Sequence, residues 1–130
     1  MLSLNGDPLT KAYPNDAGYD IQSLSTVIIN PGDVVTVDTG VYLNMQPGVY
    51  AEVCSRSGLA TKGIFVINAP GIIDNGYHGE IKVILGNVSR VPYTVHTGDR
   101  IAQLIYRRMI DYDPTQLSNR GENGFGSSGM

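Results

Sequence analysis

The sequence predicts an all-β fold, a sandwich, jelly roll or barrel built from short strands. Short apolar runs rich in β-branched residues recur at intervals of roughly 8 to 12 residues, and turn-forming residues separate them. The chain of 130 residues contains 16 glycines and 7 prolines and is 42% hydrophobic, which suits a turn-rich β protein better than a helical one. This length favours a single domain.

Each expected strand is an apolar run between turn-forming segments such as residues 30–33 (NPGD), 38–40 (DTG) and 46–48 (QPG). The expected strands cover residues 27–29, 34–37, 41–43, 50–54, 64–66, 81–85, 93–96 and 100–109. One helix of one or two turns is expected at residues 57–61. Before the first of these strands, a turn-rich segment becomes extended at Asp20.

Asn75-Gly76 is the strongest hairpin signal in the chain. Both central residues of a type I′ turn need a positive φ, which Asn and Gly adopt at little cost. In such a two-residue hairpin Asp74 and Tyr77 would face each other across the ladder, so that a carboxylate and an aromatic ring stand side by side. The alternative for this stretch alone is a tight turn with a solvated aspartate and a tyrosine packed on a strand.

Charge and composition narrow the partners and the compartment. The net charge is -3 and no run of Lys or Arg occurs, which argues against nucleic acid or an anionic membrane as the main partner. The N-terminus does not read as a secretory signal, and no apolar run approaches the ~20 residues that span a bilayer, so we expect a soluble, cytoplasmic protein.

The few thiols and imidazoles argue against a zinc site. Cys54 is the single cysteine, and it has only His78 and His96 to join it. Any metal is expected to be a hard cation held by oxygen, such as Mg²⁺ arriving with phosphates.

Several residues suggest a site for an anion. Arg56, Ser57 and Gly58 open the short helix, where hydroxyl groups, a close backbone approach and a guanidinium suit phosphate, although serine also caps helices that bind nothing. Alternation along the last strand places Arg100 and Gln103 on opposite faces, and either is also an ordinary rim residue.

The C-terminal stretch 118–130 is rich in Gly and Ser and cannot fold by itself. It nevertheless carries Arg120 and Phe125, a cation and a ring among many free backbone N–H groups. Such an arm suits closure over an anionic, aromatic ligand, and the alternative is a frayed tail. Taken together with the carboxylate of Asp20 and the Asp74–Tyr77 pair, these features describe a nucleotide site.

Five stretches in order along the chain carry a family resemblance. They are residues 17–21 (AGYDI), 55–60 (SRSGLA), 71–80 (GIIDNGYHGE), 98–103 (GDRIAQ) and 120–129 (RGENGFGSSG). Together they resemble the five motifs of the homotrimeric dUTP diphosphatases, and the resemblance spans residues 17–129. It implies a jelly-roll-like β domain over residues 1–117 and an arm over residues 118–130. It further implies a homotrimer with three interface sites, each closed by the arm of a neighbour.

The resemblance also implies roles for individual residues. Asp74 would activate the water that attacks the α-phosphorus of dUTP, which gives dUMP, a supply for dTMP synthesis, and pyrophosphate. Tyr77 would pack on the deoxyribose and exclude a ribose 2′-OH. The uracil edge would be read by Asn68 and by the backbone from Gly71 through Ile73 to Asp74.

For the phosphates, the resemblance implies a second set of residues. Asp20 would hold Mg²⁺ through water, and Arg120 would pair with the γ-phosphate while Phe125 covers the uracil. The phosphate ligands would be Arg56, Ser57, Gly58 and Gln103, with further donors at Gly126, Ser127 and Ser128.

The sequence departs from the family pattern at a few positions, and other functions remain alternatives. Cys54-Ser55 replaces the common Ala-Pro, and His78 stands where the family often has Arg. A dCTP deaminase or a bifunctional deaminase-diphosphatase shares the fold. A non-catalytic nucleotide sensor with a regulatory protein partner is a rival from another class, and a carbohydrate-binding β-sandwich leaves the Arg/Phe/Gly tail without a purpose.

Overall fold

The fold was analysed in a computed structural model, which describes residues 2–3 and 9–115. The elements are β1 Leu2–Ser3, β2 Tyr19–Gln22, β3 Val27–Ile29, β4 Val34–Tyr42, β5 Val49–Cys54, α1 Ser57–Ala60, β6 Ile64–Val66, β7 Gly71–Ile73, β8 Glu80–Asn87, β9 Tyr93–Val95 and β10 Arg100–Arg108. The predicted all-β class with one short helix is confirmed. Among the described residues no helix is long and apolar enough to cross a bilayer.

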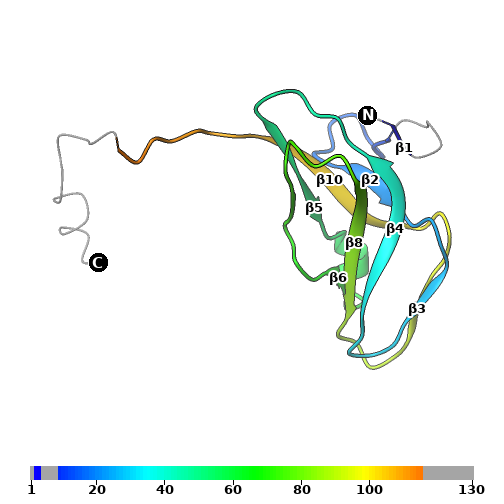
Figure 1. The fold of residues 1–130 in the computed structure, drawn as a ribbon. Helices are drawn as coiled ribbons and strands as arrows, with labels where there is room; N and C mark the ends of the chain where they lie inside the picture. The colour runs from blue at the N-terminus through cyan, green and yellow to red at the C-terminus, as the bar shows by residue number, and fades with distance from the viewer. Residues whose placement is uncertain (1, 4–8, 116–130) are drawn as a thin grey trace, which may run out of the picture.

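The strands form two four-stranded antiparallel sheets and a small two-stranded one. The first sheet has the order β1-β4-β8-β6, the second has the order β2-β10-β5-β7, and β3 pairs with β9. The two larger sheets lie face to face, as the ribbon in Figure 1 shows. Residues 109–115 then leave the body as an extended segment, drawn in orange in Figure 1.

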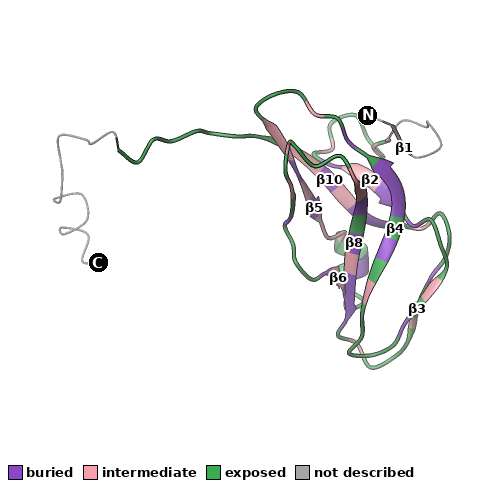
Figure 2. Ribbon diagram, viewed as in Figure 1, coloured by how far each residue is buried: buried purple, intermediate pink, exposed green. Residues whose placement is uncertain are grey.

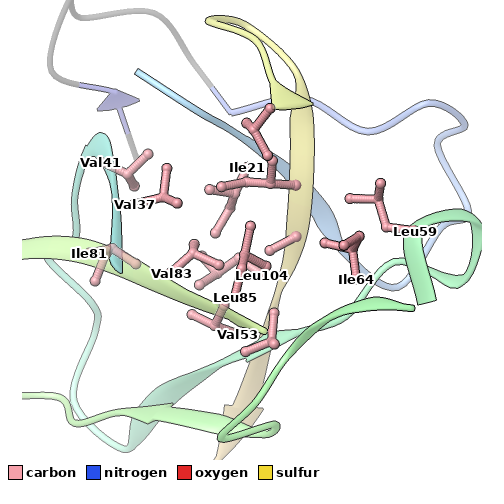
Figure 3. Close-up of a cluster of buried hydrophobic side chains, with 14 of the residues drawn as sticks. Ile21, Val37, Val41, Val53, Leu59, Ile64, Ile81, Val83, Leu85 and Leu104 are labelled. Carbon is pink, nitrogen blue, oxygen red and sulfur yellow. The ribbon is translucent and has the colours of Figure 1, made fainter. Parts of the chain in front are cut away.

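One apolar core fills the space between the two larger sheets (Figure 3). Strand β8 shows how the alternating pattern builds it, because Ile81, Val83 and Leu85 are fully buried while Lys82 between them is exposed (Figure 2). Ile21 and Leu104 meet them from the second sheet. Each such side chain contributes roughly 1.5 to 3 kcal/mol by leaving water, so the core fixes the strands that carry the site.

The predicted Asn75-Gly76 hairpin is wrong, because the two strands that flank this turn belong to different sheets. β7 pairs with β5, whereas β8 pairs with β4 and β6. The Tyr77 N–H does close a turn onto the Asp74 carbonyl at 3.0 Å. Neither Asn75 nor Gly76 has a positive φ, so the turn is not type I′. A crossover between sheets has no hairpin twist for a primed turn to match.

The predicted turn at residues 38–40 is wrong as well. β4 runs without a break through this stretch, and its pairing with β8 shifts register between Asp38 and Val41. Gly40 takes φ 68° in this β-bulge. Turn-forming residues in the sequence therefore mark an irregularity inside a strand, a feature that local patterns do not separate from a turn.

Candidate active site

Five of the predicted site residues line one cleft of about 320 Å³, which we call the β2–α1 cleft. Neighbouring strands place them there, because β10 lies between β2 and β5, and Gln103 pairs with both Asp20 and Cys54. The loop after Cys54 then leads directly into α1. The predicted residues that line the cleft are Asp20, Arg56, Ser57, Gly58 and Gln103.

Gln103 is held in this cleft by two local features. Its Nε2 donates to the Ser55 carbonyl at 3.0 Å, which ties β10 to the loop before α1. Gly18 provides the space, because a Cβ at this position would lie 2.5 Å from Gln103 Oε1. The signal for Gly18 was present within the first motif, but sequence reasoning did not connect it to Gln103.

Asp20 lies between two guanidinium groups. Its Oδ1 is 3.9 Å from Arg56 Nε, its Oδ2 is 3.7 Å from Arg100 Nη1, and its side chain is only 15% exposed. Arg56 also donates from Nη1 to the Arg100 carbonyl at 3.1 Å. The carboxylate partly neutralises both cations and helps to orient Arg56, whose side chain still borders the cleft.

The prediction that Arg100 and Gln103 lie on opposite faces is wrong. The pairing of β10 with β2 shifts register between Arg100 and Ala102, so that Ile101 and Ala102 are both buried in succession. The bulge turns Arg100 towards Asp20, the residue that also pairs with Gln103.

The described residues fit Mg²⁺ only as an ion that arrives with other ligands. No group of three or more His, Cys, Asp or Glu side chains is arranged to hold a metal in the part of the chain that the structure describes. Asp20 is a single carboxylate whose distances to the two arginines exceed those of short hydrogen bonds, so its oxygens can accept from metal-bound water. Mg²⁺ commonly keeps several waters and binds one or two carboxylates together with phosphates.

Asp74 and Tyr77 line a second cleft of about 250 Å³, which we call the Asp74 cleft. The predicted adjacency of these two side chains therefore holds, although the hairpin that predicted it does not. Ile73 lines the same cleft from the end of β7. The remaining lining residues are Ile72, Glu80, Ile81 and Lys82.

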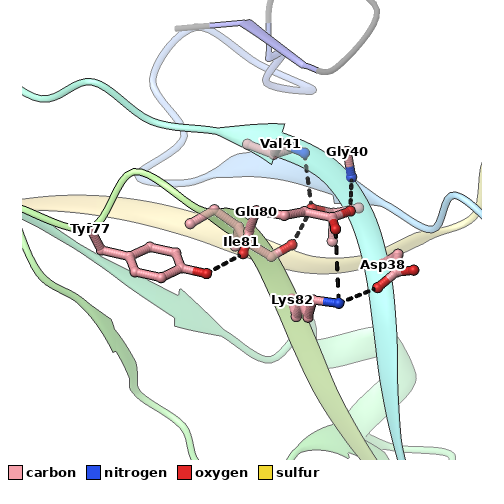
Figure 4. A network of polar contacts seen from close by, with 8 residues as sticks. Asp38, Gly40, Val41, Tyr77, Glu80, Ile81 and Lys82 are labelled. Carbon is pink, nitrogen blue, oxygen red and sulfur yellow. Dashed lines mark hydrogen bonds and ion pairs between the residues drawn. The ribbon is translucent and has the colours of Figure 1, made fainter.

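Tyr77 is anchored at its hydroxyl group. Its Oη donates to the Glu80 carbonyl at 2.7 Å while its side chain remains exposed to the cleft (Figure 4). Gly79 allows this approach, because a Cβ there would lie 2.6 Å from the Tyr77 hydroxyl oxygen. Tyr77 thus presents a ring of fixed position beside Asp74.

The bulge in β4 supports the strand end on which Tyr77 rests. Glu80 Oε2 accepts from the Gly40 N–H at 2.9 Å, and Lys82 Nζ lies 3.0 Å from Asp38 Oδ1 and 3.9 Å from Glu80 Oε1 (Figure 4). The hydrogen bond to Asp38 raises the pKa of Lys82. Sequence reasoning missed Glu80 and Lys82 in this cleft, because residues 38–40 were expected to form a turn.

Asn68 and Gly71 lie side by side at the start of β7. A Cβ on the buried Gly71 would lie 3.2 Å from Asn68 Nδ2, so the glycine permits this contact. The Ala69–Pro70 peptide between them is cis. His78, at the position where an arginine was the family expectation, is exposed, and its Nδ1 lies 3.5 Å from the Leu43 carbonyl oxygen.

The two clefts share no lining residue and are far apart in one chain. Ile73 pairs with Ala51 near the start of β5, whereas Arg56 follows the end of that strand. At about 3.3 Å per residue, Asp74 and Arg56 are on the order of 15 to 20 Å apart along the sheet. The predicted residues Arg120, Phe125, Gly126 and Ser127 lie outside the described part of the chain.

Comparison with known proteins connects this geometry to one family. The dUTPase family model matches residues 5–129. The chain is 49% identical over 119 residues to the deoxyuridine 5'-triphosphate nucleotidohydrolase of Solibacter usitatus, a match that covers 88% of this chain and 81% of that protein.

Solved structures agree with the sequence comparison. A dUTPase of Staphylococcus bacteriophage 80alpha, solved with dUpNHpp, superposes with a TM-score of 0.79 at 28% identity and covers 100% of this chain and 96% of its own. A dUTPase from phage phi11 of S. aureus, in which a structural Mg(II) ion is coordinated, gives a TM-score of 0.78 at 25% identity and covers 92% of this chain and 94% of its own.

Proposed function

Because this chain belongs to the dUTPase family and is a dUTP diphosphatase, we propose that Asp74 directs water onto the α-phosphorus of dUTP. The products are dUMP and pyrophosphate, and the water supplies the oxygen that bonds to the α-phosphorus as the bond to the bridging oxygen breaks. The observation that carries the proposal is the position of Asp74 and Tyr77 in one cleft. Transfer at phosphorus depends mainly on a positioned nucleophile and on dispersed positive charge.

Tyr77 and the segment before Asp74 recognise the nucleoside. The exposed ring of Tyr77 packs on the deoxyribose, where a ribose 2′-OH would collide with it. Asn68 and the backbone from Gly71 to Asp74, with Ile73 beside them, read the uracil edge. Support comes from the contact between Asn68 and Gly71 and from the place of Ile73 in the Asp74 cleft.

The β2–α1 cleft holds the phosphates. Arg56, Ser57, Gly58 and Gln103 line it together, and they offer a guanidinium, a hydroxyl, a backbone N–H and an amide. Asp20 holds Mg²⁺ through water, and the ion, when bound, neutralises charge on the triphosphate.

A homotrimer with shared sites follows from the separation of the two clefts. A triphosphate is shorter than the distance from Asp74 to Arg56 within one chain, so one subunit must supply the Asp74 cleft and another the β2–α1 cleft. We assign residues 1–117 to the β domain and residues 118–130 to an arm that closes a neighbour's site. On that arm Arg120 binds the γ-phosphate, Phe125 covers the uracil, and Gly126 and Ser127 donate hydrogen bonds.

Pyrophosphate release with Mg²⁺ tests the reaction and its specificity. We expect turnover of dUTP far above that of dTTP, dCTP and UTP assayed in parallel, and an absence of dUTP turnover contradicts the proposal. Ammonia release from dCTP would support a deaminase instead. Asp74→Asn should abolish turnover, a fall of at least about 10³-fold, and leave nucleotide binding largely intact, because the amide keeps the shape but is not a base. Equal loss of both contradicts the role given to Asp74.

A further inference from the structure

The side chain of Asn75 bridges two turns that are distant in sequence. Its Nδ2 donates to the Gln46 carbonyl and to the Val49 carbonyl, each at 2.8 Å. A side-chain amide has two N–H groups, so both are used by this pair of acceptors. Asn75 therefore joins the turn at residues 74–77 to the turn at residues 46–49.

The two acceptors belong to a well-fixed part of the fold. The Val49 N–H closes the 46–49 turn onto the Gln46 carbonyl at 3.2 Å, and Gly48 takes φ 82° within it. The Gly48 carbonyl accepts from the Met109 N–H at 2.8 Å, which ties this turn to the end of β10. Val49 then enters β5 and pairs with Arg108. The 46–49 turn is thus a fixed support for whatever is bound to it.

Asp74, by contrast, has little support of its own. Its side chain is exposed, and its carboxylate makes no hydrogen bond or ion pair within the described part of the chain. It follows β7, a strand of three residues at the edge of its sheet. The position of the carboxylate therefore depends on the backbone of the 74–77 turn.

From these contacts we infer that Asn75 is a positioning residue for Asp74, acting through the 46–49 turn. The inference rests on the proposed function, in which Asp74 aligns the attacking water. A displacement of about 1 Å in a reacting group lowers a rate on the order of 100-fold. Two hydrogen bonds from the adjacent residue restrain such a displacement.

Asn75→Ala removes both donors and leaves Asp74 in place. We expect kcat for dUTP to fall by about 10- to 100-fold. The Kd of a non-hydrolysable imido analogue of dUTP should change by less than about threefold, because the phosphate cleft is untouched. Asn75→Ser, which keeps one shorter donor, should give an intermediate kcat. Asn44→Ala is the matched control, because Asn44 is exposed beside the 46–49 turn and makes no hydrogen bond from its side chain within the described residues, and its kcat should equal that of the wild type.

An unchanged kcat in Asn75→Ala, with only a lower melting temperature, overturns the inference and leaves Asn75 a structural residue. An equal fall of kcat in Asn44→Ala also overturns it, because the effect is then not specific to the bridge. The proposed function is tested separately by the wild type and by Asp74→Asn. If these behave as expected while Asn75→Ala is fully active, the inference fails and the proposed function stands.

Discussion

At the scale of single residues, the ring of Tyr77 is placed by the absence of a side chain at Gly79. A Cβ at Gly79 would lie 2.6 Å from the Tyr77 hydroxyl oxygen and 2.8 Å from Cζ, so the ring must move if that Cβ is added. The movement also breaks the hydrogen bond from Tyr77 to the Glu80 carbonyl. The ring is the group that we propose to exclude a 2′-OH, so its position decides how well the site separates dUTP from UTP.

Gly79→Ala should therefore weaken sugar discrimination. We expect the ratio of kcat/KM for dUTP to that for UTP to fall on the order of tenfold, a size typical of altered contacts in an apolar pocket. The matched control is Gly76→Ala in the same turn, where an added Cβ meets no atom within 4 Å and the ratio should not change. An unchanged ratio in Gly79→Ala would show that the ring position does not set sugar selectivity.

The sequence identified these residues better than it identified their local geometry. Asp74 and Tyr77 were expected to be neighbours, and they line one cleft. The reason offered, a type I′ hairpin, is wrong because Asn75 uses its amide to bind the distant carbonyls of Gln46 and Val49. Local turn propensity cannot anticipate a partner that tertiary packing supplies.

At the scale of elements, most strands were predictable and their pairing was not. Apolar alternation located β5, β6 and β10 closely. It could not show that β7 pairs with β5, nor that the pairing of β4 with β8 continues past the bulge at Asp38. These features depend on which strand lies beside which, and that information is absent from any single run of residues.

The pairing of β2 with β10 carries an aromatic contact that makes stability depend on pH. Tyr106 of β10 packs edge to face with Tyr19 of β2, with ring centroids 5.8 Å apart and an interplanar angle of 70°. Burial, followed by the proximity of Tyr19, raises the pKa of Tyr106 from 10.0 to about 12. Between these two values the unfolded chain loses the phenolic proton and the folded chain keeps it.

The free energy of unfolding should therefore decrease as pH rises from 10 to 12, with no contribution from Tyr106 below pH 10. Tyr106→Phe has no proton to lose, so its decrease over this range should be smaller than that of the wild type. Urea unfolding at several pH values measures it, and Tyr112→Phe, which alters an exposed tyrosine, should follow the wild type. Parallel curves for all three proteins would contradict the assigned shift.

At the scale of the whole molecule, the order of strands decides whether one chain can hold a complete site. In the second sheet β2 and β7 are the two edge strands, with β10 and β5 between them. Asp20 on β2 and the turn after β7 thus lie at opposite edges as well as at different heights along β5. The sequence places both sets of residues in one list of motifs, but only the three-dimensional arrangement shows that they do not meet within a subunit.

Complementation between two inactive variants tests this shared site. Arg56→Ala disables the phosphate half and Asp74→Asn the water-activating half, so each variant alone should be inactive. When both chains are coexpressed, some interfaces combine an intact Arg56 with an intact Asp74. For random mixing in equal amounts in a cyclic trimer, one site in four is intact, so about a quarter of wild-type specific activity should return. Purified mixed trimers assayed for pyrophosphate release measure the recovery. If each site lay within one subunit, every site would carry one of the two substitutions, and the mixture would be as inactive as its components.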